Sequence, residues 1–176
     1  MKTKNVVLTG LCMALGVALP MAFHAIPNAG NILLPMHIPV LLCGFLCGWQ
    51  YGAFCGMLTP VLSSLLTGMP PAAILPGMVV ELATYGLLTG LFMQHLPVRK
   101  NISHIYASLL CAMLTGRVAY GIMNALIFRA GAYSLQLWLT ASFVTALPGI
   151  AVQLTVIPLI ILTLQKAKIV SPTTAA

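Results

Sequence analysis

Long apolar stretches, separated by short ones rich in glycine and proline, run through the whole chain of 176 residues. Within each stretch the apolar residues are continuous and do not alternate with polar ones, a pattern typical of membrane-embedded helices and not of barrel strands. No repeat or low-complexity tract divides the chain, so we expect one domain over residues 1–176. The pattern predicts six helical segments, at about 5–23, 37–50, 52–68, 73–94, 103–127 and 138–165.

Composition identifies these segments as membrane spans. Hydrophobic residues make up 60% of the chain and charged residues 5%, whereas a soluble domain is about a quarter charged. So little polar surface cannot cover a globule in water, and the bilayer is the expected solvent. We therefore predict an all-α fold, a bundle of six transmembrane helices in a multi-pass membrane protein. The first segment is long enough to span, so we interpret it as a retained helix and not as a cleaved signal peptide.

Basic residues predict the orientation. If all six segments span, both termini and the connection between the fourth and fifth spans share one side. Six of the eight basic residues fall on that side, and Arg129 alone falls on the other. The positive-inside rule makes the first side cytoplasmic, together with both termini. The six residues are Lys2, Lys4, Arg99, Lys100, Lys166 and Lys168.

The single acidic residue, Glu81, lies inside the fourth apolar segment. At about 1.5 Å per residue, it lies about 20 Å from the cytoplasmic end of its helix. By the same count, Arg117 in the fifth segment lies at about 21 Å and Gln153 in the sixth at about 18 Å. Three helices therefore place their most polar residue at one level, just to the external side of the midplane.

The two charges at this level are expected to pair. An unpaired charge there costs at least about 2.5–3.5 kcal/mol, and pairing offsets much of that cost. Because arginine suits contact with a carboxylate, we predict that Glu81 and Arg117 face each other inside the bundle. Two interpretations stay open: the pair only fixes helix packing, or it lines a ligand cavity, since intramembrane ionisable groups often mark such sites.

More polar and aromatic residues share the faces of these two charges. Spacings of three and four residues put each set on one face of its helix. Together the sets suggest a pocket that opens outward, with the charged pair at its base. Tyr and Asn side chains can equally hold membrane helices together, so that alternative stays open for each. The two sets are Gly77, Glu81 and Tyr85 in the fourth segment, and Arg117, Tyr120 and Asn124 in the fifth.

Two external connections are irregular and apolar. The first, HAIPNAGNILLPMHIP, contains three prolines, and we expect it not to be helical. The second is TGMPPAAILP. Such loops beside a membrane pocket can act as lids, or they can rest on the bilayer surface. His24 and His37 flank the first loop, a position more typical of interfacial side chains than of ligand contacts.

In the first segment, Gly10, Ala14 and Ala18 recur every four residues. Small residues at this spacing let another helix approach closely. That helix could belong to this same bundle or to another subunit, and the spacing alone favours neither.

Motifs for catalysis are missing from the sequence. There is no GxxxxGK[ST], so we expect no nucleotide hydrolysis, and one carboxylate with four scattered histidines gives no HExxH, acid pair or Ser/His/Asp set. Cys43 and Cys47 are one helical turn apart, but no further ligand joins them at metal-site spacing. We therefore expect neither an enzyme nor a metal or cofactor site. The scattered basic residues do not indicate nucleic acid binding.

Several stretches carry a resemblance to a known family. They are LPMHIPVLLCGFLCGWQYGAFCGMLTPVLSSLLTGMPP, the ELATYG that follows, and TGRVAYG in the fifth segment. With the six predicted spans, the cytoplasmic termini and the long first external connection, they make the chain resemble the substrate-binding (S) component of an energy-coupling factor (ECF) vitamin transporter. These signatures are diffuse, but the resemblance runs over nearly the whole chain.

The resemblance implies partners and a site. S components bind a vitamin or related micronutrient near the external surface and deliver it with a transmembrane coupling subunit and two ATPases, as an ABC-type importer. The family's small-residue motif maps onto Ala14 and Ala18, which with Gly10 favours a coupling-subunit interface. The implied substrate contacts are Asn31, His37, Met69, Glu81, Tyr85, Arg117, Tyr120, Asn124 and Gln153.

The sequence thus predicts a vitamin-capture subunit that is not itself an ATPase. Arg117 would attract an anionic group if Glu81 does not fully neutralise it, which favours a carboxylated vitamin such as pantothenate, and a neutral ligand also stays open. The alternative is a non-transporting structural subunit whose polar layer only holds the bundle together.

Overall fold

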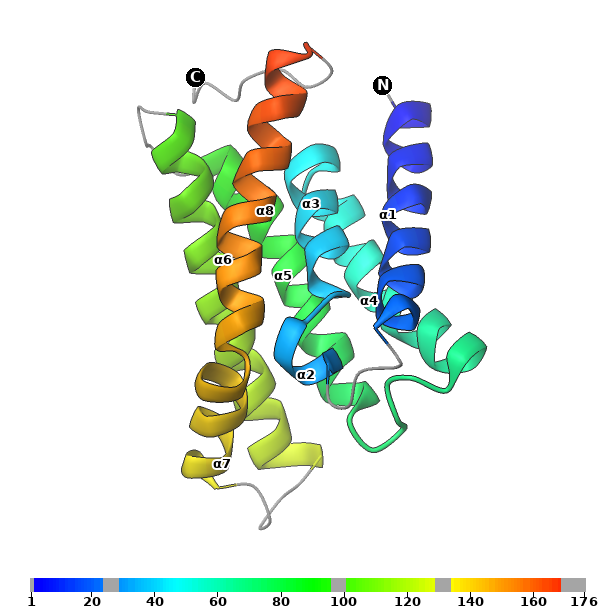
Figure 1. Cartoon of the computed structure of the whole chain (residues 1–176), viewed down its shortest axis with the longest axis vertical. Helices are drawn as coiled ribbons and strands as arrows, with labels where there is room; N and C mark the ends of the chain where they lie inside the picture. Colours follow the sequence, from blue (N-terminus) through cyan, green and yellow to red (C-terminus); the bar gives the residue numbers. More distant parts are fainter. Residues whose placement is uncertain (1, 24–28, 96–100, 129–133, 169–176) are drawn as a thin grey trace.

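The computed structural model describes residues 2–23, 29–95, 101–128 and 134–168. These residues form a bundle of helices in which α-helices and two short π-helices follow one another without a strand (Figure 1). The elements are α1 (Lys2–Ala22), α2 (Ala29–Leu33), α3 (His37–Cys47), α4 (Trp49–Thr67), α5 (Leu75–His95), α6 (Asn101–Met123), η1 (Asn124–Phe128), α7 (Leu135–Leu139), η2 (Thr140–Thr145) and α8 (Leu147–Lys166).

Five helical stretches of the described chain are long and apolar enough to cross a membrane. They are α1, the stretch Gly30–Cys47 that joins α2 to α3, α5, the α6–η1 stretch as far as Leu126, and α8. The remaining predicted segment corresponds to α4, which is 19 residues long, carries Gln50 and two serines, and is not among these five stretches. It packs against α5, α1 and α3. The all-helical class is therefore confirmed, and the count of six spans stays a prediction.

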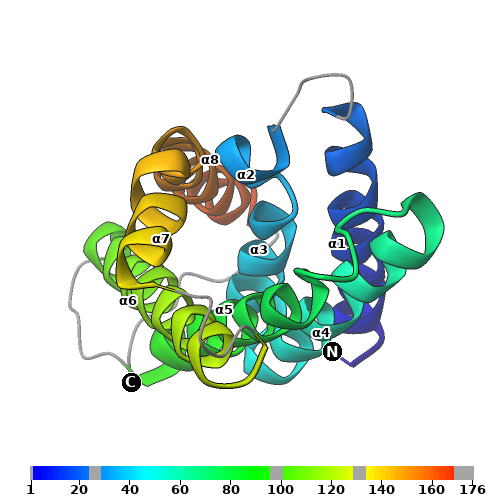
Figure 2. The ribbon, with the colours of Figure 1, turned by 90° about the horizontal axis from the view of Figure 1, so that it is seen from below.

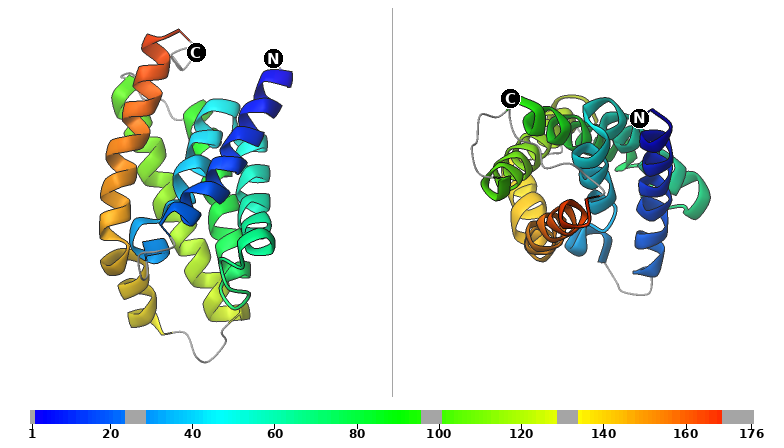
Figure 3. Two further views of the ribbon diagram at one scale, coloured as in Figure 1. Left: turned by 45° about the vertical axis from the view of Figure 1, so that its right-hand side comes forward. Right: turned by 90° about the horizontal axis from the view of Figure 1, so that it is seen from above.

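The helices share a long axis, so the bundle has two distinct ends (Figures 1 and 3). The start of α1 and the end of α8 lie at one end, which we call the terminal end. The α4–α5 connection and α7 lie at the opposite end, which we call the α7 end. Seen from the α7 end, α2, α3, α5, α6, α7 and α8 are arranged in a ring, and α1 lies outside it (Figure 2).

Glycines bring α4 and α5 into backbone contact. A Cβ atom added to Gly56 would collide with the Leu82 carbonyl, and one added to Gly86 would collide with the backbone of Gly52. Gly90 is equally close to the backbone of Trp49. Glycines at a spacing of four residues on each helix permit this approach, as in membrane helix pairs generally. The contact fixes α5, which carries Glu81, against its neighbour.

The turn between α3 and α4 is tighter than the sequence suggested. Only Gly48 separates the two helices, and its φ of 93° is a conformation that favours glycine. Trp49 and Tyr51 already belong to the first turn of α4. The boundary predicted at residues 50–52 moves accordingly, to residue 48.

Two further expectations are corrected. The first external connection is not wholly irregular, because Ala29–Leu33 forms α2. The last predicted segment begins earlier than residue 138, since α7, η2 and α8 form a nearly continuous stretch from Leu135 to Lys166. The α2 helix lies against α8: a Cβ atom on Gly149 would come within 2.7 Å of the Ile32 carbonyl oxygen.

One face of α1 is covered by the bundle and the other is not. Thr9 and Cys12 are buried, and Gly16 lies against Thr59 of α4. Gly10, Ala14 and Ala18 lie on the exposed face. The small residues therefore do not serve the internal packing of α1.

The described basic residues near the two chain termini lie at the same end of the bundle, as the predicted orientation requires. Lys4 is in the first turn of α1, and Lys166 and Lys168 lie at the end of α8, all at the terminal end (Figure 1). Arg99, Lys100, Arg129 and also His24 lie outside the described residues. The assignment of the terminal end to the cytoplasm stays a prediction.

Candidate functional site

Glu81 and Arg117 meet inside the bundle. Nη1 of Arg117 on α6 lies 3.9 Å from Oε1 of Glu81 on α5. Glu81 is 7% exposed and Arg117 is 4% exposed, so both charges are removed from lipid. The prediction that these two charges face each other is confirmed.

Glu81 has two further neighbours. The Tyr85 hydroxyl, one turn further along α5, donates a 2.9 Å hydrogen bond to Oε1. His37, the first residue of α3, places Nε2 3.8 Å from Oε2, and its ring contacts Tyr85 edge-on with centroids 5.4 Å apart. Three helices thus converge on one carboxylate.

Several polar atoms of this cluster are unused by the protein. Both charge contacts, at 3.8 and 3.9 Å, are longer than a hydrogen bond. Nε and Nη2 of Arg117 and both ring nitrogens of His37 are buried without a hydrogen-bond partner among the described residues. Buried polar groups are normally satisfied, because an unmet donor costs free energy. These atoms are therefore hydrogen-bonding groups of Arg117 and His37 that the described residues leave unsatisfied.

A cavity of about 320 Å³ adjoins the cluster. It is lined by residues of α2, α3, α5, α6 and η2 and of the segments next to them. Its volume is at the lower limit of small-molecule pockets, which run from about 300 to 1,000 Å³. The lining residues are Gly30, Asn31, Leu34, His37, Ile74, Met78, Glu81, Arg117, Tyr120, Ala141, Ser142 and Thr145.

Glycines also set the distance between α5 and α6, the two helices that carry the charges. A Cβ atom on Gly77 would lie 2.6 Å from Nδ2 of Asn124 and 2.8 Å from the Tyr120 ring. Gly116 lies directly against the Tyr85 ring, where a Cβ atom would not fit. The two stripes recognised in the sequence therefore face each other, with small residues on each helix opposite large ones on the other.

Aromatic residues of the α7–η2 segment hold the other side of Arg117. The Phe143 ring lies 6.0 Å from the guanidinium carbon, within the range of a cation–π contact. The Trp138 indole donates a 3.0 Å hydrogen bond to the Arg117 carbonyl oxygen and packs edge-on against Phe143. Arg117 is thus fixed between a carboxylate and an aromatic pair.

Of the nine residues predicted to contact substrate, five line the cavity: Asn31, His37, Glu81, Arg117 and Tyr120. The other four lie outside its lining. Tyr85 is fully buried beneath Glu81. Asn124 is buried and donates a hydrogen bond of 2.8 Å to the Tyr120 carbonyl oxygen.

Gln153 and Met69 differ from these two. Gln153 is fully buried on α8, and both polar atoms of its amide are without a hydrogen-bond partner among the described residues. Met69 lies in the α4–α5 connection and is 42% exposed.

Sequence reasoning missed two parts of the lining. Leu34, Ile74 and Met78 give the cavity an apolar wall, and nothing distinguishes them in the sequence from other apolar residues. Ser142 and Thr145 of η2 give small hydroxyls on the opposite side. Their signal was the group of small polar residues in TASFVT, just before Pro148.

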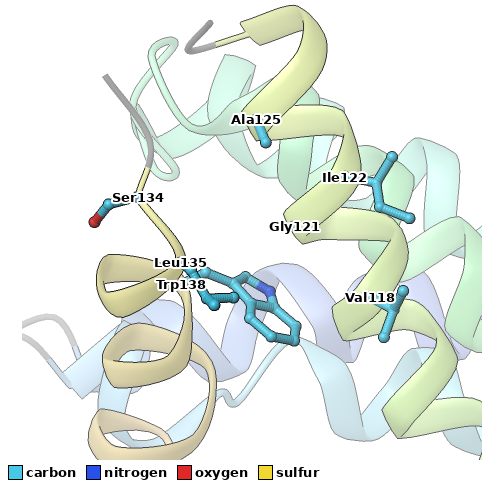
Figure 4. A pocket seen from close by; sticks show the side chains of 7 residues that line it. All are labelled: Val118, Gly121, Ile122, Ala125, Ser134, Leu135 and Trp138. Carbon is cyan, nitrogen blue, oxygen red and sulfur yellow. The ribbon is translucent and has the colours of Figure 1, made fainter. Parts of the chain in front are cut away.

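A second pocket, of about 260 Å³, lies between α6 and α7. Figure 4 shows the Trp138 ring on α7 directed toward α6, near Gly121 and Val118. Apart from Ser134 and the indole N–H of Trp138, its lining side chains are apolar. Since that N–H already bonds to Arg117, this pocket offers little to orient a polar ligand.

Comparison with known families agrees with the membrane bundle. The family model for the substrate-specific component of ECF transporters matches residues 4–161. The chain belongs to this family, and it is a multi-pass protein of the cell membrane. No curated protein and no solved structure matches it.

Proposed function

We propose that this protein is the substrate-capture subunit of an ECF importer and that it binds a vitamin or related micronutrient in the 320 Å³ cavity above Glu81 and Arg117. The observation that carries the proposal is that Arg117 and His37, two residues that line this cavity, have buried nitrogen atoms without a hydrogen-bond partner among the described residues. A pair that served packing alone would be expected to use its hydrogen-bonding atoms within the protein.

The proposed topology has six spans, with α4 as the third. α4 lies beside α5, and glycine contacts hold the two together (Figure 3). With the terminal end in the cytoplasm, the α7 end and the cavity face the exterior. Lys4, Lys166 and Lys168 support this orientation through the positive-inside rule.

The proposed partners are a transmembrane coupling subunit and two ATPase subunits, which is how members of this family work. The exposed small-residue face of α1, formed by Gly10, Ala14 and Ala18, is the proposed contact with the coupling subunit. Small residues let a partner helix approach closely within lipid. In this arrangement the chain itself is not an enzyme, and the ATPases supply the energy.

A purely structural subunit is the second candidate, and the Glu81–Arg117 contact itself favours it. Such a pair can fix helix register without binding anything. The charge-swapped variant, Glu81→Arg with Arg117→Glu, separates the two. We expect it to keep its thermal unfolding temperature within a few degrees and to lose at least tenfold in affinity for the small molecule that co-purifies with the wild type. Unchanged binding in a folded swap, or no bound molecule in the wild type, would favour the structural role.

A further inference from the structure

We propose that the cavity selects a dipolar small molecule of net charge zero, with an acceptor group against Arg117 and an N–H donor against Glu81. This inference rests on the proposed function, because it assigns the class of substrate that the same cavity takes. It differs from the sequence-based expectation of an anionic ligand such as pantothenate, because the charges of the proposed ligand sum to zero.

The acceptor end of the ligand follows from Arg117. Its Nε and Nη2 atoms are buried and have no hydrogen-bond partner among the described residues, while Nη1 is directed at Glu81. Two neighbouring N–H groups of a guanidinium form a fork that matches a carboxylate or a carbonyl group. The Phe143 ring lies 6.0 Å from the guanidinium carbon, and Arg117 lines the cavity, so the cavity is where we place such an acceptor.

The donor end follows from Glu81. Its Oε1 accepts the Tyr85 hydrogen bond, but its Oε2 lies 3.8 Å from His37, too far for a hydrogen bond. An ionised carboxylate accepts several hydrogen bonds and has no proton to donate. A ligand N–H or ammonium group near Oε2 could donate the hydrogen bond that His37 is too far away to make.

The net charge follows from the distance between the two residues. With 3.9 Å between the guanidinium and the carboxylate, any group beside one is also close to the other. A lone anion would gain from Arg117 and be repelled by Glu81, and a lone cation would meet the reverse. Because the two residues are so close together, the attraction and the repulsion largely cancel for a single charge. Both interactions are strong in a buried site, since screening there is weak. A ligand with both groups gains from both.

The remainder of the ligand faces an apolar wall. Leu34, Ile74 and Met78 add apolar side chains to the lining of the cavity. A compact carbon frame or ring fits this wall and the volume of about 320 Å³.

The test uses the purified full-length protein in lipid nanodiscs. It is incubated with a deproteinised metabolite extract of bacterial cells and washed, and the retained molecules are released and identified by mass spectrometry. We expect one retained species per chain whose structure carries both an acceptor group and an N–H donor, with net charge zero at pH 7. A retained species that is a net anion or a net cation would overturn this inference and leave the proposed function intact. If the wild type retains nothing, the proposed function fails, and this inference fails with it.

Charge-removing variants give a second readout. In Glu81→Gln, Arg117 is no longer opposed, so retention should shift at least tenfold from the neutral species toward anionic ones. The double variant Glu81→Gln with Arg117→Gln restores charge balance without the dipole, and it should retain the neutral species at least tenfold less. Lys166→Gln removes a charge from the far end of α8 and should change the retention of neither the neutral nor the anionic species. Wild-type retention in the double variant, or no shift in a folded Glu81→Gln, would contradict the inference.

Discussion

Tyr85 donates a hydrogen bond of 2.9 Å to Glu81, which lies one turn earlier on the same helix. The two residues are buried together, and Gly116 of α6 leaves the space that the Tyr85 ring fills. Tyr85 therefore acts from below the cavity: it holds the carboxylate in place without lining the space itself.

Removing the hydroxyl tests this positioning role. Tyr85→Phe should lower the free energy of unfolding by about 1.5–3 kcal/mol, because hydrogen bonds to charged groups contribute about that much. Tyr106→Phe, on the exposed face of α6, is the matched control and should change little. Thermal unfolding of the two purified variants measures the difference. Equal stability of both would show that the hydroxyl does not support the carboxylate.

Gly116 gives a steric version of the same test. Gly116→Ala places a Cβ atom against the Tyr85 ring, so the ring or α6 must shift. We expect a loss of about 1–3 kcal/mol in unfolding free energy, as for other overpacked sites. Gly10→Ala is the control for stability, because nothing lies within 4 Å of its added Cβ atom. A stable Gly116→Ala would contradict the close packing of α5 on α6.

The exposed face of α1 predicts a separation of binding from transport. Ala14→Trp and Ala18→Trp should each abolish uptake by the complete importer while leaving substrate affinity within about twofold, because a large ring blocks close helix approach. Leu159→Trp, on the exposed side of α8, is the control for a bulky change facing lipid. Uptake in whole cells and binding to the purified subunit give the two readouts. If binding is lost along with uptake, the small residues serve the bundle itself.

The proposed topology predicts which residues react from outside the cell. Ala72→Cys, in the α4–α5 connection, should be labelled by a membrane-impermeant maleimide in intact cells. Ala167→Cys, after α8, should be labelled only after permeabilisation. The unaltered chain, with its five native cysteines, gives the background. Labelling of both positions from the same side would show that the number of spans between them is not three, and that α5, α6 or α8 does not cross the membrane.

Much of the fold could be predicted because a membrane chain shows its helices as apolar runs. The pairing of Glu81 with Arg117 could be predicted as well, since the bilayer makes an unpaired charge costly and the rise per residue puts both at one depth. Neither step needs knowledge of side-chain packing. This is why the charged base of the cavity could be located from the sequence.

The missed features depend on contacts between distant segments. The five-residue helix α2 is too short to be stable by itself, and it lies against Gly149 of α8. The π-helices carry no periodic signal, yet η2 supplies Ser142 and Thr145 to the cavity. The spacing of Gly52 with Gly56 and of Gly86 with Gly90 was visible in the sequence. Those pairs could have indicated the close contact between α4 and α5.

The most direct test of the account is whether filling the cavity removes the bound molecule. Met78→Trp places a large ring at the apolar wall of the cavity, and Leu65→Trp, on the exposed side of α4, is its control. Both are compared with the wild type by native mass spectrometry after incubation with a deproteinised bacterial metabolite extract. We predict one small molecule per chain on the wild type and on Leu65→Trp, and none on a folded Met78→Trp. An empty wild type, or full occupancy of Met78→Trp, would contradict the claim that this cavity captures the transported nutrient.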